Sequence, residues 1–363
     1  MEITDTGAMP GKDRYGYIIK PEEIILVTGA NGFIGTRVVR TLLSYGFKRV
    51  RCLTRSTRKL NKLEEIANEF IDTNSEIMKG NLLSHDDCLR AAKGVSIIYH
   101  LAAGVGKSFP DCFLNSVVAT RNLLEAVIKE NKLKRFVNIS SIAVYTNEKI
   151  RRGGLLDETC GVDTKLVERY EPYIYGKAKQ DEIVLDYART KDLPYVLVRP
   201  GVVFGPGKPK ITGRIGIDTF GFFLHLGLNN KMPLTYVDNC AEAIVLAGLR
   251  KGLEREVINI IDDNLPRSRD FLRLYKKHVH RFVSLPVPYP AFYLFNYLWE
   301  KYSKWSKGQL PPAFNRRTCA AYYKGNTYSN KKAKRLLKWK PRVSMDEGMQ
   351  MFFDYIRETE AKK

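Results

Sequence analysis

Residues Ile24 to Gly35 read I-I-L-V-T-G-A-N-G-F-I-G, an apolar run that ends at three glycines spaced three residues apart. The run lacks polar alternation, which is typical of a strand buried on both faces of a parallel sheet. Gly29 allows a tight turn, Gly32 lets backbone N–H groups approach a pyrophosphate, and Gly35 lets the next helix lie close to the strand. The stretch therefore predicts a strand, a phosphate-binding turn and a helix N-terminus.

Beyond this stretch, short apolar runs alternate with helical patterns. Strands are expected near residues 50–53, 76–78, 95–99 and 135–139, and helices near 35–45, 86–92 and 113–130. This spacing predicts an α/β fold, a doubly wound parallel sheet of the Rossmann type. Ligands bind such sheets beyond the carboxyl ends of the strands.

The same pattern predicts the domain organisation. We expect a loose extension over residues 1–22 and a dinucleotide-binding domain over 23–200, to which 233–262 return. Residues 201–232 and 263–363 form the expected substrate-binding region, which is smaller and mostly helical.

The charge balance is strongly basic, with 60 Lys and Arg against 39 Asp and Glu, a formal net charge of +21. Such a charge favours an anionic partner such as a nucleotide or a membrane surface, although a host that favours lysine explains it equally well. No zinc-finger spacing or RNA-binding signature accompanies it, so neither a nucleic-acid partner nor a metal site is expected.

Six scattered cysteines without a C-x-x-C motif predict reduced thiols in a cytoplasmic protein. The longest uncharged run, Phe282 to Trp299, contains three prolines, so a membrane-spanning helix is not expected.

The end of the second strand bears on the cofactor. A carboxylate there would bind the adenosine ribose diol and repel a 2′-phosphate, but this chain has Thr54 and Arg55, with Arg58 and Lys59 close behind. Because Arg55 can pair with a 2′-phosphate, the sequence favours NADP(H) over NAD(H). The alternative is a solvated basic loop.

Two overlapping Tyr-x-x-x-Lys pairs follow, Tyr173 with Lys177 and Tyr175 with Lys179. Residues four apart share a helix face, and the second pair continues into apolar positions whereas the first continues into Asp181. We therefore choose Tyr175 and Lys179. A tyrosine beside an ammonium can exchange a proton with an alcohol or ketone oxygen, and Ser141 would hydrogen-bond that oxygen.

These motifs together resemble the extended short-chain dehydrogenase/reductases, in the broad NAD-dependent epimerase/dehydratase and 3β-hydroxysteroid dehydrogenase group. The resemblance covers nearly the whole chain in seven stretches: V-T-G-A-N-G-F-I-G (Val27 to Gly35), H-L-A-A (His100 to Ala103), S-S-I-A-V-Y (Ser140 to Tyr145), Y-G-K-A-K (Tyr175 to Lys179), R-P-G-V-V-F-G-P-G (Arg199 to Gly207), L-T-Y-V-D-N-C-A-E-A (Leu234 to Ala243) and L-L-K-W-K-P (Leu336 to Pro341).

The resemblance implies an NAD(P)-dependent enzyme. The implied catalytic residues are Ser141, Tyr175, Lys179 and Asn115. The implied cofactor-binding residues are Gly29, Asn31, Gly32, Phe33, Ile34, Gly35, Arg55, Asn81, Leu82, Leu101, Ala102, Ala103, Lys179, Pro200, Val202 and Val203.

Two positions depart from the family pattern. Asn81 stands where the family has an aspartate that meets the adenine amino group, and an amide can still accept that hydrogen bond. Ile142 and Ala143 stand where nucleotide-sugar dehydratases have an Asp-Glu pair, which argues against 4,6-dehydration.

The substrate is expected to be a small molecule. The aromatic residues after Leu265 favour an apolar ring alcohol or ketone of the hydroxysteroid or sterol kind, although they can equally fill a second core or meet a membrane surface. The basic charge fits the alternative, a nucleotide sugar for an epimerase or reductase, with Arg316 or Arg317 on its diphosphate. A third possible function is that of a non-catalytic NADP(H)-binding protein. Besides small molecules and a membrane surface, a second copy of the chain in a homodimer is a possible partner.

Overall fold

The structure is a computed structural model, and it describes residues 16–56, 60–70, 73–106, 108–208, 212–219, 221–307 and 309–361. Arg58, Lys59 and residues 1–15 of the expected extension therefore lie outside the described residues. The rest of that extension is not loose, because the Ile18 N–H donates to the Leu249 carbonyl at 2.9 Å and Ile19 is buried.

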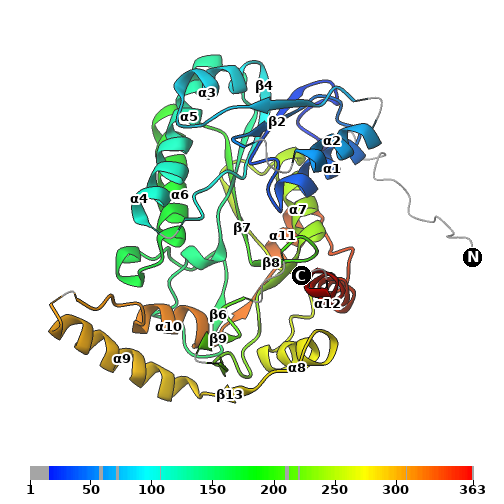
Figure 1. The fold of residues 1–363 in the computed structure, drawn as a ribbon. Helices are drawn as coiled ribbons and strands as arrows, with labels where there is room; N and C mark the ends of the chain where they lie inside the picture. Colours follow the sequence, from blue (N-terminus) through cyan, green and yellow to red (C-terminus); the bar gives the residue numbers. More distant parts are fainter. Residues whose placement is uncertain are drawn as a thin grey trace, which may run out of the picture.

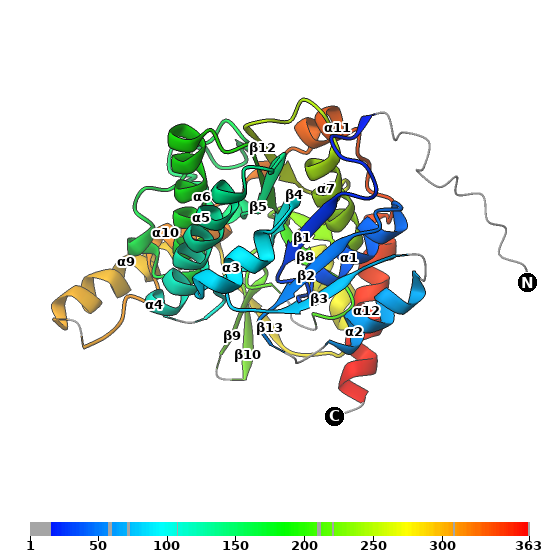
Figure 2. The same cartoon turned by 90° about the horizontal axis from the view of Figure 1, so that it is seen from above.

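A seven-stranded parallel sheet forms the centre of the molecule, in the order β12-β7-β5-β4-β1-β2-β3 (Figure 2). Its strands are β1 (Ile24–Thr28), β2 (Val50–Thr54), β3 (Glu76–Lys79), β4 (Val95–His100), β5 (Arg135–Ile139), β7 (Tyr195–Pro200) and β12 (Glu256–Ile260). The predicted Rossmann-type sheet is confirmed. Each strand expected from the sequence ends within one residue of its predicted bounds.

Helices cover both faces of the sheet, as Figures 1 and 2 show. Apolar residues of six helices belong to the core cluster of one face: α1 (Gly35–Ser44), α2 (Asn61–Glu69), α7 (Val237–Leu249), α8 (Ser268–His278), α11 (Lys331–Leu337) and α12 (Met345–Ala361). Those of three others belong to the cluster of the opposite face: α3 (His85–Ala92), α5 (Ala119–Glu130) and α6 (Pro172–Lys191). A π-helical segment, Phe113–Val118, precedes α5.

The strand order reverses between β1 and β4. Val27 of β1 is paired with Cys52 of β2 on one side and with Tyr99 of β4 on the other. The connections from these strands leave toward opposite edges, so a crevice opens at their carboxyl ends. The glycine turn lies at this crevice because it directly follows β1.

Smaller elements lie beyond the carboxyl ends of the main sheet (Figure 1). They are β6 (Leu155–Leu156), β8 (Val202–Phe204), β9 (Gly216–Thr219), β10 (Phe222–His225), β11 (Leu234–Tyr236), β13 (Ser284–Pro286), β14 (Thr327–Tyr328), α4 (Phe109–Cys112), α8 (Ser268–His278), α9 (Tyr289–Trp305) and α10 (Arg316–Tyr323). The predicted boundary at residue 263 does not match the packing, because Trp339, Phe352 and Phe353 are buried in the same core as α1.

The aromatic residues of α9 divide between a small core and the surface. Phe292 contacts Tyr323 and Phe314, with ring centroids 5.7 and 6.4 Å apart, beside Leu226 and Cys319. This confirms the interpretation that part of the aromatic region fills a second core. Within the described part of the chain, no helix is long and apolar enough to cross a bilayer. All six cysteines are free thiols.

Candidate active site

A cavity of about 510 Å³ opens at the carboxyl ends of β1, β4, β5 and β7. Each of these strands is followed directly by residues that line it. Eleven predicted site residues are among its lining: Gly29, Gly32, Phe33, Ile34, Gly35, Leu101, Ala103, Ser141, Pro200, Val202 and Val203. The structure therefore brings the glycine turn and Ser141 to one cavity.

The glycine turn is shaped so that side chains would not fit. Gly29 has φ +65°, a left-handed conformation that favours glycine, and its N–H donates to the Leu53 carbonyl at 3.1 Å. A Cβ on Gly35 would lie 2.2 Å from the Gly29 carbonyl oxygen, and one on Gly32 would lie 3.0 Å from it. The turn and the N-terminus of α1 thus form a bare backbone cradle that fits a pyrophosphate.

Ser141 directly follows Ser140 at the end of β5. Its hydroxyl oxygen accepts a hydrogen bond from the Ala143 N–H at 3.2 Å and so caps a short 3-10 turn, Ile142–Val144. This cap fixes the position of the hydroxyl at the edge of the cavity. Ser141 can therefore cap the 3-10 turn and also offer its hydroxyl to a ligand in the cavity.

Tyr173 and Lys177 of α6 line the same cavity as Ser141. The buried Lys177 ammonium donates to the Ile139 carbonyl at 2.5 Å and to the Gln180 side-chain oxygen at 2.9 Å. Burial lowers the pKa of Lys177 to about 8, although the nearby Asp181 carboxylate opposes this shift. A cation is thus held one helical turn from a tyrosine that faces the cavity.

The structure does not bring Tyr175 and Lys179 to the cavity that Ser141 lines. The Tyr175 ring packs edge-to-face on Phe109, with ring centroids 5.4 Å apart. The Lys179 ammonium forms an ion pair with Glu182 at 2.6 Å, and its side chain is 38% exposed. Neither residue is among those that line the cavity with Ser141.

Asp181 explains this difference. The polar Asp181 suggests a solvated helix face, but its carboxylate is buried and accepts hydrogen bonds from Asn138, Ser140 and Arg199 at 2.9, 2.7 and 3.0 Å. Because positions four and eight residues earlier share its helix face, Lys177 and Tyr173 point to the same side. In the sequence, the Tyr-x-x-x-Lys-x-x-x-Asp spacing followed by Arg199 was the signal that could have indicated this buried face.

The Tyr173 hydroxyl is protonated at neutral pH in the protein alone. Loss of hydration raises its pKa to about 12, and the nearby Cys112 thiol adds to the shift. This side chain is thus ready to give a proton to a ketone oxygen. To accept one from an alcohol it needs a cation that stabilises the phenolate.

Asn115 and Arg55 lie together, outside the cavity lining. The Arg55 guanidinium donates to the Asn115 side-chain oxygen at 2.5 Å, and the Asn115 amide donates to the Asp111 carbonyl at 3.0 Å. Arg55 is exposed where β2 ends. The Asn31 amide joins the glycine turn to this strand end by donating to the Ser56 carbonyl at 3.2 Å.

Three other predicted cofactor contacts also lie outside the cavity lining. The Asn81 side-chain oxygen accepts from the Leu83 N–H at 3.1 Å, and Leu82 is buried in the core beneath α3 and α5. Ala102 abuts the turn, since a Cβ on Gly29 would lie 3.1 Å from its nitrogen.

Two cations from the segment after β8 line the cavity. Lys208 lies over the Phe33 ring with its ammonium 5.9 Å from the centroid, and Arg214 lies over the Tyr322 ring at 4.9 Å. All four residues line the cavity, and none of its described lining residues is acidic. Both cations belong to the expected substrate-binding region 201–232, although no motif in the sequence marks either of them.

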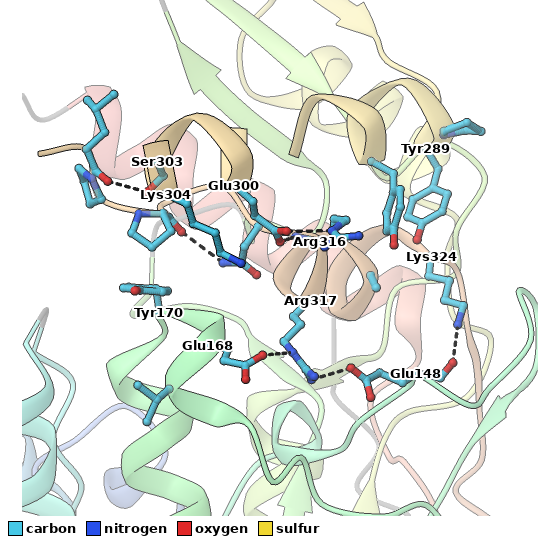
Figure 3. Close-up of a pocket in the computed structure, with 18 residues that line it drawn as sticks. Glu148, Glu168, Tyr170, Tyr289, Glu300, Ser303, Lys304, Arg316, Arg317 and Lys324 are labelled. Carbon is cyan, nitrogen blue, oxygen red and sulfur yellow. Dashed lines mark hydrogen bonds and ion pairs between the residues drawn. The ribbon is translucent and has the colours of Figure 1, made fainter. Parts of the chain in front are cut away.

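A larger cavity of about 1280 Å³ lies between α9, α10 and the segment around Glu168 (Figure 3). Arg316 is paired with Glu300 and Arg317 with Glu168, each at 2.8 Å, so both guanidinium groups already have carboxylate partners. The two arginines do not line the cavity with Ser141, so the structure does not bring the expected diphosphate contacts to the glycine turn. The smaller cavity is therefore the candidate active site.

The chain is similar to known proteins over much of its length. Residues 25–260 match the NAD dependent epimerase/dehydratase family. Cinnamoyl-CoA reductase 1 of Petunia hybrida is 29% identical over 188 residues, 51% of this chain and 55% of that protein. A trifunctional UDP-glucose 4,6-dehydratase/UDP-4-keto-6-deoxy-D-glucose 3,5-epimerase/UDP-4-keto-L-rhamnose-reductase of Arabidopsis thaliana is 28% identical over 282 residues, 71% of this chain and 40% of that protein. The chain spans about half or less of these relatives.

Solved structures share the fold over most of the chain. The UDP-glucuronic acid 4-epimerase of Bacillus cereus in complex with NAD has a TM-score of 0.68 and 23% identity, covering 93% of this chain and 98% of that one. MoeE5 in complex with UDP-glucuronic acid and NAD has a TM-score of 0.67 and 21% identity, covering 93% and 99%. These likenesses confirm the predicted fold class.

Proposed function

This chain belongs to the NAD dependent epimerase/dehydratase family, and on that premise we propose that it interconverts a secondary alcohol and a ketone on a nucleotide-linked sugar, as an epimerase or reductase. One observation carries the proposal. Ser141, Tyr173 and Lys177 line the same cavity as a bare glycine cradle and two cations, Lys208 and Arg214.

The side chains divide the chemistry between them. The Tyr173 hydroxyl gives its proton to the ketone oxygen, or takes one from the alcohol in the reverse direction. The Ser141 hydroxyl donates a hydrogen bond to that oxygen and holds the reacting carbon in place. The Lys177 ammonium favours the Tyr173 phenolate by its charge. When bound, the nicotinamide cofactor accepts or supplies the hydride.

The two cations of the cavity support a substrate with a diphosphate. Lys208 and Arg214 offer charge-assisted hydrogen bonds to phosphate oxygens, and the Tyr322 ring offers an apolar surface. The Arabidopsis relative and the Bacillus structure are both named for UDP-sugar substrates, which supports the same class of substrate. The expected hydroxysteroid or sterol substrate loses its basis, because no described aromatic residue of α9 lines this cavity.

Dehydration is not part of the proposal. The positions after Ser141 that would carry acids are Ile142 and Ala143, and both line the cavity. Because none of the described lining residues carries a carboxylate, the cavity has no acid pair that could remove the proton and expel the water.

For the cofactor, we propose a preference for NADP(H). The described end of β2 carries Thr54, Arg55 and Ser56 and no carboxylate that would repel a 2′-phosphate. Replacing Arg55 by Asp should weaken NADPH binding at least tenfold more than NADH binding, measured by fluorescence titration of each. Equal losses would show that Arg55 does not meet the 2′-phosphate.

The proposed reaction is tested with the purified protein, NADPH or NAD⁺, and separate panels of UDP-sugars, UDP-ketosugars and apolar ring ketones. Absorbance follows the reduced cofactor, and chromatography identifies the sugar product. An epimerised sugar without net cofactor change, or a reduced ketosugar with equal loss of NADPH, supports the proposal. Turnover of ring ketones alone contradicts it, and cofactor binding without any turnover indicates a non-catalytic binding protein.

The matched variants Arg214→Met and Arg317→Met locate the substrate. Loss of Arg214 should raise KM for the sugar about tenfold or more with a smaller effect on kcat, because it removes a contact made before the reaction. Loss of Arg317, which lines the other cavity, should leave KM within twofold of the wild-type value.

A further inference from the structure

Helix α9 has a buried face and, opposite it, an exposed apolar face. Phe292, Asn296 and Ser303 are buried against the body of the protein. Leu294, Leu298 and Trp305 repeat the same spacing two residues later and are 56%, 57% and 76% exposed. Because two residues correspond to about 200° of helix rotation, this second face points away from the protein.

We name Leu294, Leu298 and Trp305 the outer face of α9. In Figure 1 the helix runs along one edge of the molecule, and in Figure 2 it extends outward from the body. The high exposed fractions show that no described residue covers this face. Large apolar side chains gathered on an exposed face indicate an interaction surface.

The charges near the outer face are of one sign. Lys301, Lys304 and Lys307 are exposed on the last turn of α9 and just beyond it. Glu300 is the only acidic residue of α9, and it is paired with Arg316 at 2.8 Å, with its side chain 17% exposed. Lys301 falls on the outer face itself, three residues after Leu298 and four before Trp305. No carboxylate of this helix neutralises it or the other two lysines.

The exposed apolar surface continues into the preceding strand. Val283 and Leu285 are 60% and 46% exposed, and Leu285 belongs to β13, which leads into α9. Phe222 of β10, the strand paired with β13, is 48% exposed. In Figure 1 β13 lies at the same lower edge of the molecule as α9.

We propose that α9 binds the surface of a lipid bilayer that contains anionic lipids. The outer face enters the boundary between headgroups and acyl chains, where Trp305 and the exposed Tyr302 suit the interface. Lys301, Lys304 and Lys307 meet the lipid phosphates, and each contributes favourable electrostatic energy near such a surface. The helix lies on the bilayer and does not cross it.

Charge favours a bilayer over a second copy of this chain. Two α9 helices docked by their outer faces would bring six lysines together, and like charges at an interface are costly. The chain as a whole carries a formal charge of +21, which opposes self-association and favours an anionic surface.

Vesicle sedimentation tests the proposal with the full chain. We expect vesicles of phosphatidylcholine with phosphatidylserine to bind the protein at least ten times better than phosphatidylcholine alone, with weaker binding at high salt. The triple variant Leu294→Ser, Leu298→Ser, Trp305→Ser and the variant Lys301→Glu, Lys304→Glu, Lys307→Glu should each lose at least nine-tenths of the binding.

Two controls match these variants. Leu185→Ser replaces a leucine of α6 whose side chain is 40% exposed. Lys62→Glu, Lys93→Glu, Lys132→Glu makes the same change in net charge on the described surface near α2, α3 and α5. Both controls should bind vesicles as the wild type does. Turnover and cofactor binding in solution, measured in parallel, should be unchanged in all four variants.

Three outcomes overturn the proposal. One is a wild-type protein that ignores anionic vesicles, and another is equal loss of binding in the variants and their matched controls. The third is a dimer in analytical ultracentrifugation that the serine variant disperses, which would assign the outer face to a second copy. Failure of the proposed reaction leaves the vesicle result unaffected, because the cavity lining and the outer face share no residue.

Discussion

The Asp181 carboxylate accepts a hydrogen bond from the Arg199 guanidinium at 3.0 Å, and their side chains are only 2% and 5% exposed. This pair joins α6 to β7 in the interior. Because the same carboxylate also accepts from Asn138 and Ser140, it fixes the rotation of α6 about its axis. That rotation places Lys177 and Tyr173 at the cavity that Ser141 lines.

Replacing Tyr173 by Phe should lower kcat at least a hundredfold and leave cofactor affinity nearly unchanged, because only the proton-transferring hydroxyl is lost. Tyr175→Phe is the matched control, since its ring packs on Phe109 outside the cavity lining. It should retain activity within threefold. The measurements are turnover of the substrate found in the panel and a NADPH titration. The opposite ranking of the two variants would restore Tyr175 as the acid–base.

Replacing Asp181 by Asn should destabilise the protein by about 3–5 kcal/mol, because it leaves the buried Arg199 without its counter-charge. Asp186→Asn is the control, since Asp186 pairs with Arg189 on the surface, where the side chains are 52% and 79% exposed. It should cost about 1 kcal/mol or less. Denaturant unfolding measures both, and similar losses would show that the Asp181 pair is not a structural anchor.

Replacing Gly35 by Ala should weaken dinucleotide binding at least tenfold. The new Cβ would lie 2.2 Å from the Gly29 carbonyl oxygen, so the turn must shift away from α1. Gly213→Ala offers a control at a glycine with nothing within 4 Å of an added Cβ. Fluorescence titration with NADPH compares them. Wild-type affinity in Gly35→Ala would mean that the close approach of turn and helix is not required.

The protein should lose stability as the pH falls below about 6.5, partly because of His100. Burial lowers the pKa of this histidine to about 3, and the Lys177 charge adds to the shift. Its ring nitrogens lie 2.8 and 2.9 Å from the hydroxyls of Thr28 and Thr120. Between pH 6.5 and 3 the unfolded chain binds a proton that the folded protein does not, so stability falls by up to about 1.4 kcal/mol per pH unit.

His100→Gln removes this titration and should flatten the dependence of unfolding free energy on pH from 6.5 to 5 by up to that amount. His85→Gln is the control, because His85 is exposed. It should leave the slope as in the wild type. A slope that is the same in all three proteins would show that another group controls the acid sensitivity.

The sequence by itself determined the sheet and the place of the glycine turn. Strands, turns and helices of a βαβ unit depend on local patterns: the apolar run Ile24 to Val27, the glycines after it, and the alternation up to Ile139. The carboxyl ends of parallel strands meet at one edge whatever the details of packing. This is why Gly29, Leu101, Ser141 and Pro200 could be placed together before the structure was known.

Only the tertiary structure decided which tyrosine and lysine line the cavity with Ser141. Both Tyr-x-x-x-Lys pairs have the same spacing, and α6 is buried on more than one side, so polarity did not mark its inner face. Asp181 looked like a surface residue because its three partners, Asn138, Ser140 and Arg199, are far from it in sequence. A buried carboxylate is stable only where such donors converge, and their convergence is a property of the folded chain.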